Sequence, residues 1–171
     1  MLRLAKAFLD IAFWRRSPAQ LPASLFLLGL AATTVGMLEV LGAFLPPYSS
    51  DQIVMRVALS VGLPIGWSWA VLRIAGRRER FLQTCIALLG VAAFAQLVLY
   101  PLGSLLNALG SHHPAAVPLG VLSFAVLLWY LLACAHVWRA ALDSGLALGV
   151  AVSLGYLLLS IVLEQRLLPD N

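Results

Sequence analysis

Two ionisable side chains lie inside otherwise apolar stretches of the sequence. Glu39 lies near the end of the first long apolar stretch, and Arg56 lies near the start of the second. A charged side chain is costly in hydrocarbon and therefore usually faces protein or water. At 1.5 Å per helical residue, both positions fall within roughly 10 Å of the same membrane boundary. We therefore predict a Glu39–Arg56 ion pair between consecutive antiparallel helices.

Three roles are open for these two residues. The pair clamps the two helices together, or Arg56 instead extends to the outer lipid headgroups, or the two charges bind a substrate or a proton. Pro64, between Gly62 and Gly66, predicts a kink in the helix that carries Arg56. Broken helices line substrate sites in some transporters, although a proline inside a membrane helix often only shapes packing.

Histidines and cysteines suggest no ligand site. His112 and His113 are adjacent, and neighbouring side chains do not converge on one metal ion without distortion. Cys85 and Cys134 are far apart and lie inside apolar stretches, which predicts free, buried thiols. We therefore expect no metal site, no cofactor and no disulfide.

The sequence shows no sign of a common enzymatic motif. The sequence has no pattern typical of a nucleophile elbow, a metal-binding helix or a phosphate-binding loop. One polar group that could act on lipid combines residues 73–80 with His136 and Asp143, and it has no obvious nucleophile. We therefore predict that the protein is not an enzyme.

A basic segment, RIAGRRER, separates the second apolar stretch from the third. Its arginines are Arg73, Arg77, Arg78 and Arg80. Such a segment fits retention on the cytoplasmic side of a membrane. It also suits contact with anionic lipid headgroups or with an acidic partner.

Small residues recur every four positions near the last apolar stretch, at Ala141, Gly145, Gly149 and Ser153. On one helix this spacing places all four on the same face, and small residues let two helices approach closely. We predict a helix contact inside the bundle. A dimer face or a partner-binding face is the alternative.

Membrane-spanning helices must position these residues. The chain has 171 residues, of which 62% are hydrophobic and 11% charged, and its mean hydropathy is +0.96. A soluble domain usually has about a quarter charged residues, so lipid must surround most of this chain. The net charge of +4 comes from residues at the ends of apolar stretches, which argues against nucleic-acid binding.

The apolar stretches predict a single all-α transmembrane domain, residues 1–171, built as a bundle of five transmembrane helices. A span takes about 20 residues, and turn-forming residues separate the stretches. The predicted spans cover about residues 22–45, 53–74, 81–103, 117–138 and 145–164. A polar loop is expected over residues 104–116.

An N-terminal interfacial helix is predicted over residues 1–16, which are too short and too charged to span. Arg3, Lys6 and Asp10 share one stripe of this helix, so its apolar remainder can lie in the headgroup layer. Trp14 suits an interfacial anchor. A cleaved signal peptide is the competing interpretation, but Asp10 interrupts the apolar run that it requires.

Basic residues also predict orientation. With the N-terminus in the cytoplasm, nine of the eleven Lys and Arg residues lie on the cytoplasmic side. Arg56 and Arg166 lie on the opposite side. We therefore expect a multi-pass protein of the bacterial inner (cytoplasmic) membrane, with a cytoplasmic N-terminus and a periplasmic C-terminus.

The string DIAFWRRSPAQLPAS, residues 10–24, resembles the start of small bacterial integral membrane proteins of the Yip1-like family. The layout of five closely spaced spans after an amphipathic segment is also similar to a Yip1-type membrane domain. The resemblance implies a membrane scaffold or adaptor and brings no catalytic residue. The sequence departs from the eukaryotic members by lacking their long cytosolic N-terminal region, so the resemblance implies no vesicle-traffic partner.

We therefore expect a non-enzymatic adaptor or accessory subunit in the lipid bilayer. It would bind a membrane-protein partner, or further copies of itself, through helix faces such as the row of small residues. The alternative is a small-solute carrier or substrate-binding membrane subunit with its site near Glu39 and Arg56.

Overall fold

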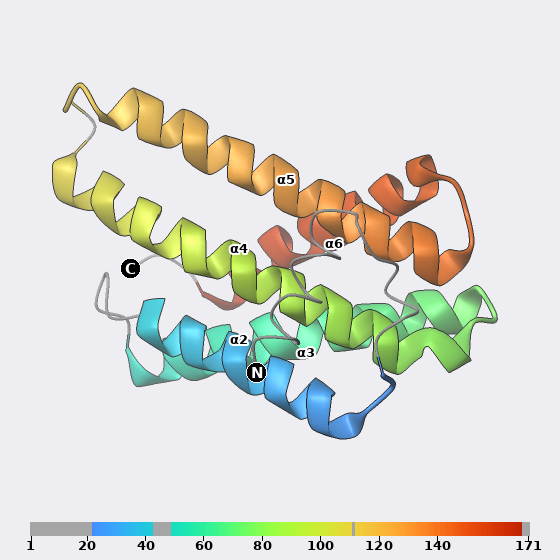
Figure 1. The fold of residues 1–171 in the computed structure, drawn as a ribbon. Coiled ribbons are helices and arrows are strands. Elements are labelled where there is room, and N and C mark those ends of the chain that lie inside the picture. Colours follow the sequence, from blue (N-terminus) through green and yellow to red (C-terminus); the bar gives the residue numbers. More distant parts are fainter. Residues whose placement is uncertain (1–21, 43–48, 111, 169–171) are drawn as a thin grey trace.

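The computed structural model describes residues 22–42, 49–110 and 112–168, and this part of the chain is helical without any strand. Its helices are α2 (Leu25–Gly42), α3 (Ser50–Ile74), the short 3-10 helix η2 (Arg78–Arg80), α4 (Phe81–Leu109), α5 (Ala116–Leu142) and α6 (Leu146–Leu167) (Figure 1). The all-α prediction is therefore confirmed. The interfacial helix predicted for residues 1–16 lies outside the described residues.

Within the described ranges, five helices are long and apolar enough to cross a membrane. The shortest, α2, has 18 residues, and the longest, α4, has 29. At 1.5 Å per residue these helices are about 27 and 43 Å long, and the hydrocarbon core of a bilayer is about 30 Å thick. The prediction of five helices of membrane-spanning length is therefore confirmed.

Helix α4 is longer than the predicted span. It continues through Pro101 and ends at Leu109, so most of the first half of the expected loop over residues 104–116 is helical. Leucine and alanine dominate this last part of α4 and favour helix despite the polar Ser104 and Asn107. Gly110 then ends the helix with a φ of +75°, a backbone conformation that glycine adopts readily.

Helix α3 begins at a capping box and continues through its proline. The Ser49 hydroxyl accepts a hydrogen bond from the Gln52 amide at 3.3 Å, and the Gln52 side chain accepts one from the Ser49 amide at 3.0 Å. These bonds satisfy amides that the first helical turn leaves without partners. Pro64 is buried inside α3, which remains one helix from Ser50 to Ile74.

The helices form two antiparallel hairpins with α6 beside them (Figure 1). Helices α2 and α3 form one hairpin, and α4 and α5 form the other. Helix α4 is central, because it packs against α2, α3 and α5. Helix α6 packs mainly against α5 and also contacts α3.

The buried core is concentrated toward one end of the bundle. All buried residues of α4 lie between Thr84 and Ala95, and those of α5 lie between Ala133 and Ala141. Trp138, with 1% of its surface exposed, is the largest fully buried side chain among the described residues. This end contains the turns between α3 and α4 and between α5 and α6, so the opposite halves of α4 and α5 are packed less tightly.

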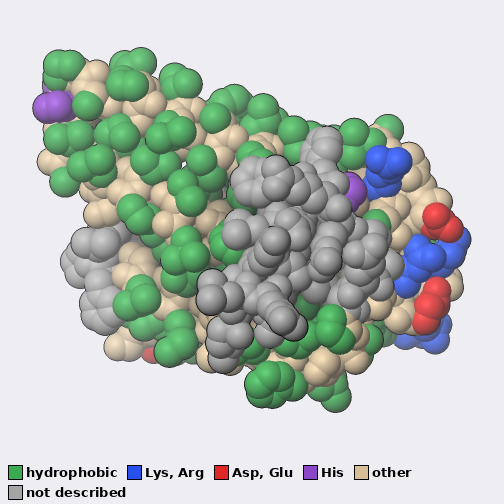
Figure 2. All heavy atoms as spheres, viewed as in Figure 1, with side chains coloured by type: hydrophobic (Ala, Val, Ile, Leu, Met, Phe, Trp, Pro, Cys, Tyr) green, Lys and Arg blue, Asp and Glu red, His purple; other side chains and the backbone are tan. Residues whose placement is uncertain are grey.

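Charged side chains gather at the same end. In Figure 2 the visible Lys, Arg, Asp and Glu side chains lie mainly at the right, and hydrophobic side chains cover the upper left. The described arginines near the two turns are Arg73, Arg77, Arg78, Arg80 and Arg139. The tightly packed end of the bundle is therefore also its most strongly charged end.

Candidate functional site

Glu39 of α2 and Arg56 of α3 form an ion pair. Nε of Arg56 lies 3.6 Å from Oε2 of Glu39, and the side chains are 27% and 10% exposed, respectively. Glu39 lies on the buried face of α2, three residues before the helix ends at Gly42. The structure thus brings together the two charged residues that the sequence singled out.

Helix α4 supplies two further polar partners to Glu39. The Gln96 side-chain amide donates a 2.9 Å hydrogen bond to Oε1 of Glu39. The Tyr100 hydroxyl also hydrogen-bonds the Glu39 carboxylate. We call Glu39, Arg56, Gln96 and Tyr100 the polar cluster, because one carboxylate joins side chains from α2, α3 and α4.

Gly42 makes room for the Tyr100 ring. A Cβ atom at Gly42 would lie 2.9 Å from Cε2 of Tyr100, which is shorter than a normal contact. The glycine therefore lets the aromatic ring approach the end of α2 and reach Glu39. The sequence pattern did not reveal this close contact between Gly42 and Tyr100.

Sequence reasoning identified half of the polar cluster. Glu39 and Arg56 stand out in the sequence as charges inside apolar stretches, whereas Gln96 and Tyr100 do not. Their spacing of four residues places them on one face of α4, and this was the available signal. A single sequence does not show that this face of α4 meets α2, so the two residues could not be assigned to Glu39.

The polar cluster suits a structural link and also suits a polar ligand. Both carboxylate oxygens of Glu39 have partners on other helices, so the carboxylate ties three helices together. Arg56 is still partly exposed at this position. The cluster therefore combines fixed hydrogen-bonding groups with one partly exposed cation.

The predicted row of small residues is interrupted by a turn. Ala141 lies on α5, and Gly145 is the residue immediately before α6. Asp143 lies between them in the left-handed region, with a φ of 55°. The interpretation of one continuous helix face is therefore corrected, because α5 and α6 are separate helices.

The remaining two small residues lie inside the bundle. Gly149 and Ser153 are the buried residues of α6. A Cβ atom at Gly149 would collide with the carbonyl oxygen of Ala135 and would lie 3.2 Å from the backbone nitrogen of Arg139. The glycine thus permits close contact between α5 and α6, and this part of the row is not a free surface.

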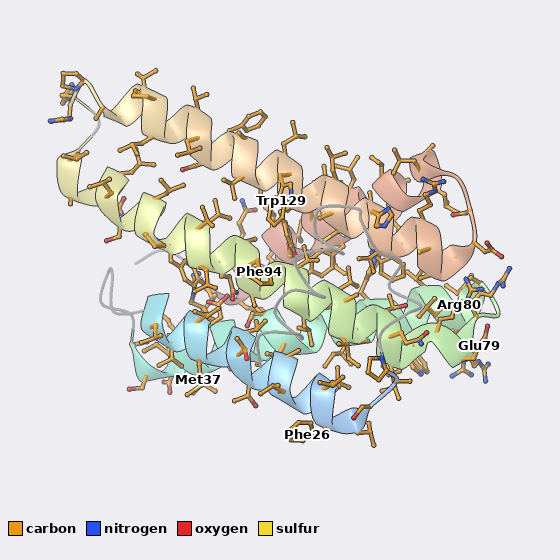
Figure 3. The ribbon with its side chains drawn as sticks, viewed as in Figure 1. Phe26, Met37, Glu79, Arg80, Phe94 and Trp129 are labelled. Atoms are coloured by element: carbon orange, nitrogen blue, oxygen red, sulfur yellow. The ribbon has the colours of Figure 1, made fainter. Side chains whose placement is uncertain are left out.

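Two arginines of the basic segment contact the end of α5 and the turn that follows it. Nη1 of Arg80 donates hydrogen bonds to the carbonyl oxygens of Ala140 and Ala141, at 2.7 and 3.3 Å. Nη2 of Arg77 lies 3.7 Å from Oδ2 of Asp143. Arg80 lies at the charged end of the bundle, near the end of α5 (Figure 3), so these contacts tie the α3–α4 turn to the α5–α6 turn.

The other two arginines of this segment are exposed. The Arg73 guanidinium lies 4.9 Å from the centre of the Trp69 ring, in a cation–π arrangement on the surface of α3. Arg78 is exposed in η2. Contact with lipid headgroups or with an acidic partner is therefore open to Arg73 and Arg78 more than to Arg77 and Arg80.

An apolar groove runs between α2 and α3 and has a volume of about 830 Å³. Residues that line it include Ala32, Gly36, Met37, Val57, Ala58 and Gly62. Ala58, Gly62 and Gly66 follow one another at four-residue spacing on the exposed face of α3. Added Cβ atoms at Gly62 and Gly66 would meet no atom within 4 Å. This second row of small residues, unlike Gly149 and Ser153, faces outward.

Among the described residues, the thiols and histidines form no group that could hold a metal ion. Cys85 and Cys134 are free and buried. His113 uses Nδ1 to accept a hydrogen bond from the Ala115 amide. In the described ranges, no three His, Cys, Asp or Glu residues come together in a way that could hold a metal ion.

A comparison of the chain with known protein families, with curated proteins and with solved structures finds no match.

Proposed function

We propose that the protein is a non-enzymatic adaptor or accessory subunit of the bacterial inner membrane. It binds one transmembrane helix of a partner protein in the groove between α2 and α3. The observation that carries this proposal is the outward row of small residues, Ala58, Gly62 and Gly66, beside that groove. Membrane helices associate by close packing over small residues, since the hydrophobic effect gives little drive within lipid.

The shape of the groove supports a helix as its occupant. Gly36 faces Val57 across the contact between the two helices. Ala58 and Gly62 line the α3 side of the groove, where their small size leaves room for another helix. Met37 and Leu41 are strongly exposed and provide flexible apolar surface along the α2 side. The resemblance of residues 10–24 to Yip1-like proteins agrees with a scaffold or adaptor role.

The proposed orientation has the charged end of the bundle in the cytoplasm. The arginines near the turns then satisfy the positive-inside rule, and Trp69 and Arg73 reach the cytoplasmic headgroups. The N-terminus is cytoplasmic and the C-terminus periplasmic in this arrangement. Arg73 and Arg78 are the residues we propose for contact with anionic lipids.

The adaptor proposal is tested by filling the groove. In a Gly62→Leu variant the new side chain has open space, so the chain folds, but a partner helix can no longer approach. The matched control is Gly103→Leu on α4, where an added Cβ also meets no atom within 4 Å. Native mass spectrometry of protein extracted in mild detergent from its own host measures the bound partner.

We expect a stoichiometric second protein on the wild type and on Gly103→Leu, and its loss from Gly62→Leu. A second copy of the same chain that disappears in the same way identifies a homo-oligomer. If the partner stays bound to Gly62→Leu, the groove is not the docking site. If no partner is present on any form, the adaptor proposal is contradicted.

A small-solute carrier or substrate-binding subunit is the second candidate function. It is favoured by the convergence of polar groups from three apolar helices on Glu39. Glu39→Gln separates the two functions, because an adaptor keeps its partner in this variant. A carrier loses solute binding instead, since the negative charge of the site is gone.

A further inference from the structure

One exposed face runs along the whole of helix α3, and we call it the α3 face. It begins at Asp51 and ends at Arg73, and both residues are exposed. Residues spaced three or four positions apart lie on one side of a helix. Between the two charged residues this spacing is kept by five further exposed residues, which are Met55, Ala58, Gly62, Gly66 and Trp69.

The two ends of the α3 face have opposite charges. Asp51 lies in the first turn of α3, and Arg73 lies in the last. At 1.5 Å per residue the helix rises about 33 Å between them, which is close to the roughly 30 Å of hydrocarbon in a bilayer. When α3 spans a bilayer, the two charges therefore lie near opposite boundaries, and the apolar middle of the face lies between them.

The groove beside the α3 face is uncharged between these two ends. The residues that line it on α2 and α3 are all uncharged. Glu39 of α2 and Arg56 of α3 form an ion pair with each other. The Arg73 guanidinium stays beside the Trp69 ring of the same face, 4.9 Å from its centre. Within the described parts of α2 and α3, Asp51 and Arg73 are therefore the charges that a molecule on this face meets.

A second copy of the chain does not suit the α3 face. Copies that insert in the same direction pair about a two-fold axis along the membrane normal, and the same patch then meets itself. Their α3 helices run parallel, so that each Asp51 faces its counterpart and each Arg73 faces its counterpart. Like charges opposite each other oppose association. The charge pattern therefore disfavours self-association through this face.

We propose that the α3 face binds a transmembrane helix of a different protein, which has an acidic residue opposite Arg73 and a basic residue opposite Asp51. The inference rests on the proposed adaptor function and specifies the chemistry of the partner. Added Cβ atoms at Gly62 and Gly66 would meet no atom within 4 Å, so the partner backbone can come close. Opposite charges at the two ends then fix the register and the direction of the partner helix.

A charge-reversed copy of the chain serves as the probe for such a partner. Asp51→Lys with Arg73→Glu leaves the small residues of the face unchanged and makes its end charges complementary to the wild type. The two forms are co-expressed in bacteria, and both insert in the same direction because most Lys and Arg residues are unchanged. Both contain Ala58→Cys in a background of Cys85→Ala and Cys134→Ala. Oxidation of isolated membranes with copper phenanthroline links two α3 faces that meet, and a mass tag on one form identifies mixed pairs.

We expect mixed disulfide pairs to exceed the pairs formed by either form alone at least about tenfold. Gly62→Leu in both forms should remove the mixed pairs, and Gly103→Leu on α4 should leave them unchanged. If the wild-type face cross-links to itself as strongly as to the reversed face, the occupant is a second copy and the inference is wrong. If no mixed pairs form, the face accepts no helix of this charge pattern, and the inference is equally wrong.

The natural partner separates this inference from the adaptor proposal. Native mass spectrometry of protein from its own host should find the partner on the wild type and not on the chain with Asp51→Lys and Arg73→Glu. If Gly62→Leu loses the partner but the charge-reversed chain keeps it, the adaptor proposal holds and this inference fails. If no form has a partner, the adaptor proposal itself is contradicted.

Discussion

Glu39 shows how one buried carboxylate can be tolerated in an apolar bundle. Removing a carboxylate from water is costly unless other groups replace the lost hydrogen bonds. Here Arg56, Gln96 and Tyr100 replace them, and they come from two helices that neighbour α2. The Glu39 carboxylate, which would destabilise the bundle if it had no partners, therefore forms specific contacts between helices.

Arg56→Met tests whether the ion pair with Glu39 stabilises the fold. The variant keeps the length of the side chain but leaves Glu39 without its cation. We expect the free energy of unfolding to fall by roughly 1.5–3 kcal/mol, toward the lower end because Arg56 is 27% exposed. Titration with sodium dodecyl sulfate, followed by tryptophan fluorescence, measures the change.

Arg78→Met is the matched control for Arg56→Met, because Arg78 is exposed in η2. Its free energy of unfolding should stay within about 0.5 kcal/mol of the wild type. An equal loss in the two variants would show that the ion pair with Glu39 contributes nothing specific.

The contact between α5 and α6 depends on the absence of a side chain at one position. A methyl group at Gly149 has no space, because the neighbouring atoms belong to the backbone of α5 and cannot rotate away. We expect Gly149→Ala to lower the free energy of unfolding by about 1–3 kcal/mol. The same detergent titration provides the measurement.

Gly103→Ala is the matched change in a helix where the added methyl group meets no atom within 4 Å. It should be neutral or slightly stabilising, since alanine favours helix over glycine. A Gly149→Ala variant as stable as Gly103→Ala would contradict the close contact of α5 with α6.

The Arg80 side chain stabilises the end of α5. The last carbonyl groups of a helix have no partners within the helix and carry a partial negative charge. Arg80→Gln removes the cation that meets two of them, and we expect a loss of about 1–2 kcal/mol. Hydrogen exchange should become faster at the amides around Asp143 and at the start of α6.

Arg78→Gln serves as the control for Arg80→Gln, since it changes the same charge on the exposed side of η2. Its hydrogen exchange near Asp143 should match the wild type. Faster exchange in both variants would mean that net charge, and not the contact with α5, protects this turn.

The helices themselves were largely predictable, and their contacts were not. Apolar length sufficed to predict five long helices, because backbone groups in lipid must be satisfied within each segment. The extension of α4 past residue 103 was missed, since Asn107 and Ser104 look like loop residues. The row from Ala141 to Ser153 was assigned to one helix, because four-residue spacing alone does not reveal the turn at Asp143.

At the scale of the whole molecule, the bundle has two unlike ends. One end has the buried core, the clustered arginines and the turn contacts of Arg77 and Arg80. The other end has the polar cluster and helix halves that contribute few buried residues. The tightly packed, charged end can stabilise the fold. The end with the polar cluster and the α2–α3 groove therefore need not contribute as much to stability.

Cysteine labelling tests the orientation that this asymmetry suggests. In a background of Cys85→Ala and Cys134→Ala, we expect His112→Cys to react with a membrane-impermeant maleimide on intact spheroplasts. Ala75→Cys should react only after the membrane is permeabilised, because the proposed orientation places the end of α3 on the cytoplasmic side. The reverse pattern would overturn the proposed orientation, and labelling of both positions would show mixed insertion.

The polar cluster marks the limit of what the sequence could reveal. Charges inside apolar stretches are conspicuous, so Glu39 and Arg56 could be paired from depth alone. Gln96 and Tyr100 are polar residues of ordinary appearance, and their relevance depends on which helix faces meet. That information lies in the packing of α4 against α2.

The Arg80 contact also imposes an order on biosynthesis. Arg80 leaves the ribosome 60 positions before Ala140, whose carbonyl oxygen it will bind. The chain is made from its N-terminus, so α2, α3 and α4 can enter the membrane before this contact exists. Only when the end of α5 has emerged can the guanidinium close the α4–α5 hairpin. A nascent chain that stops before residue 140 therefore has neither of the two carbonyl oxygens that Arg80 binds in the finished fold.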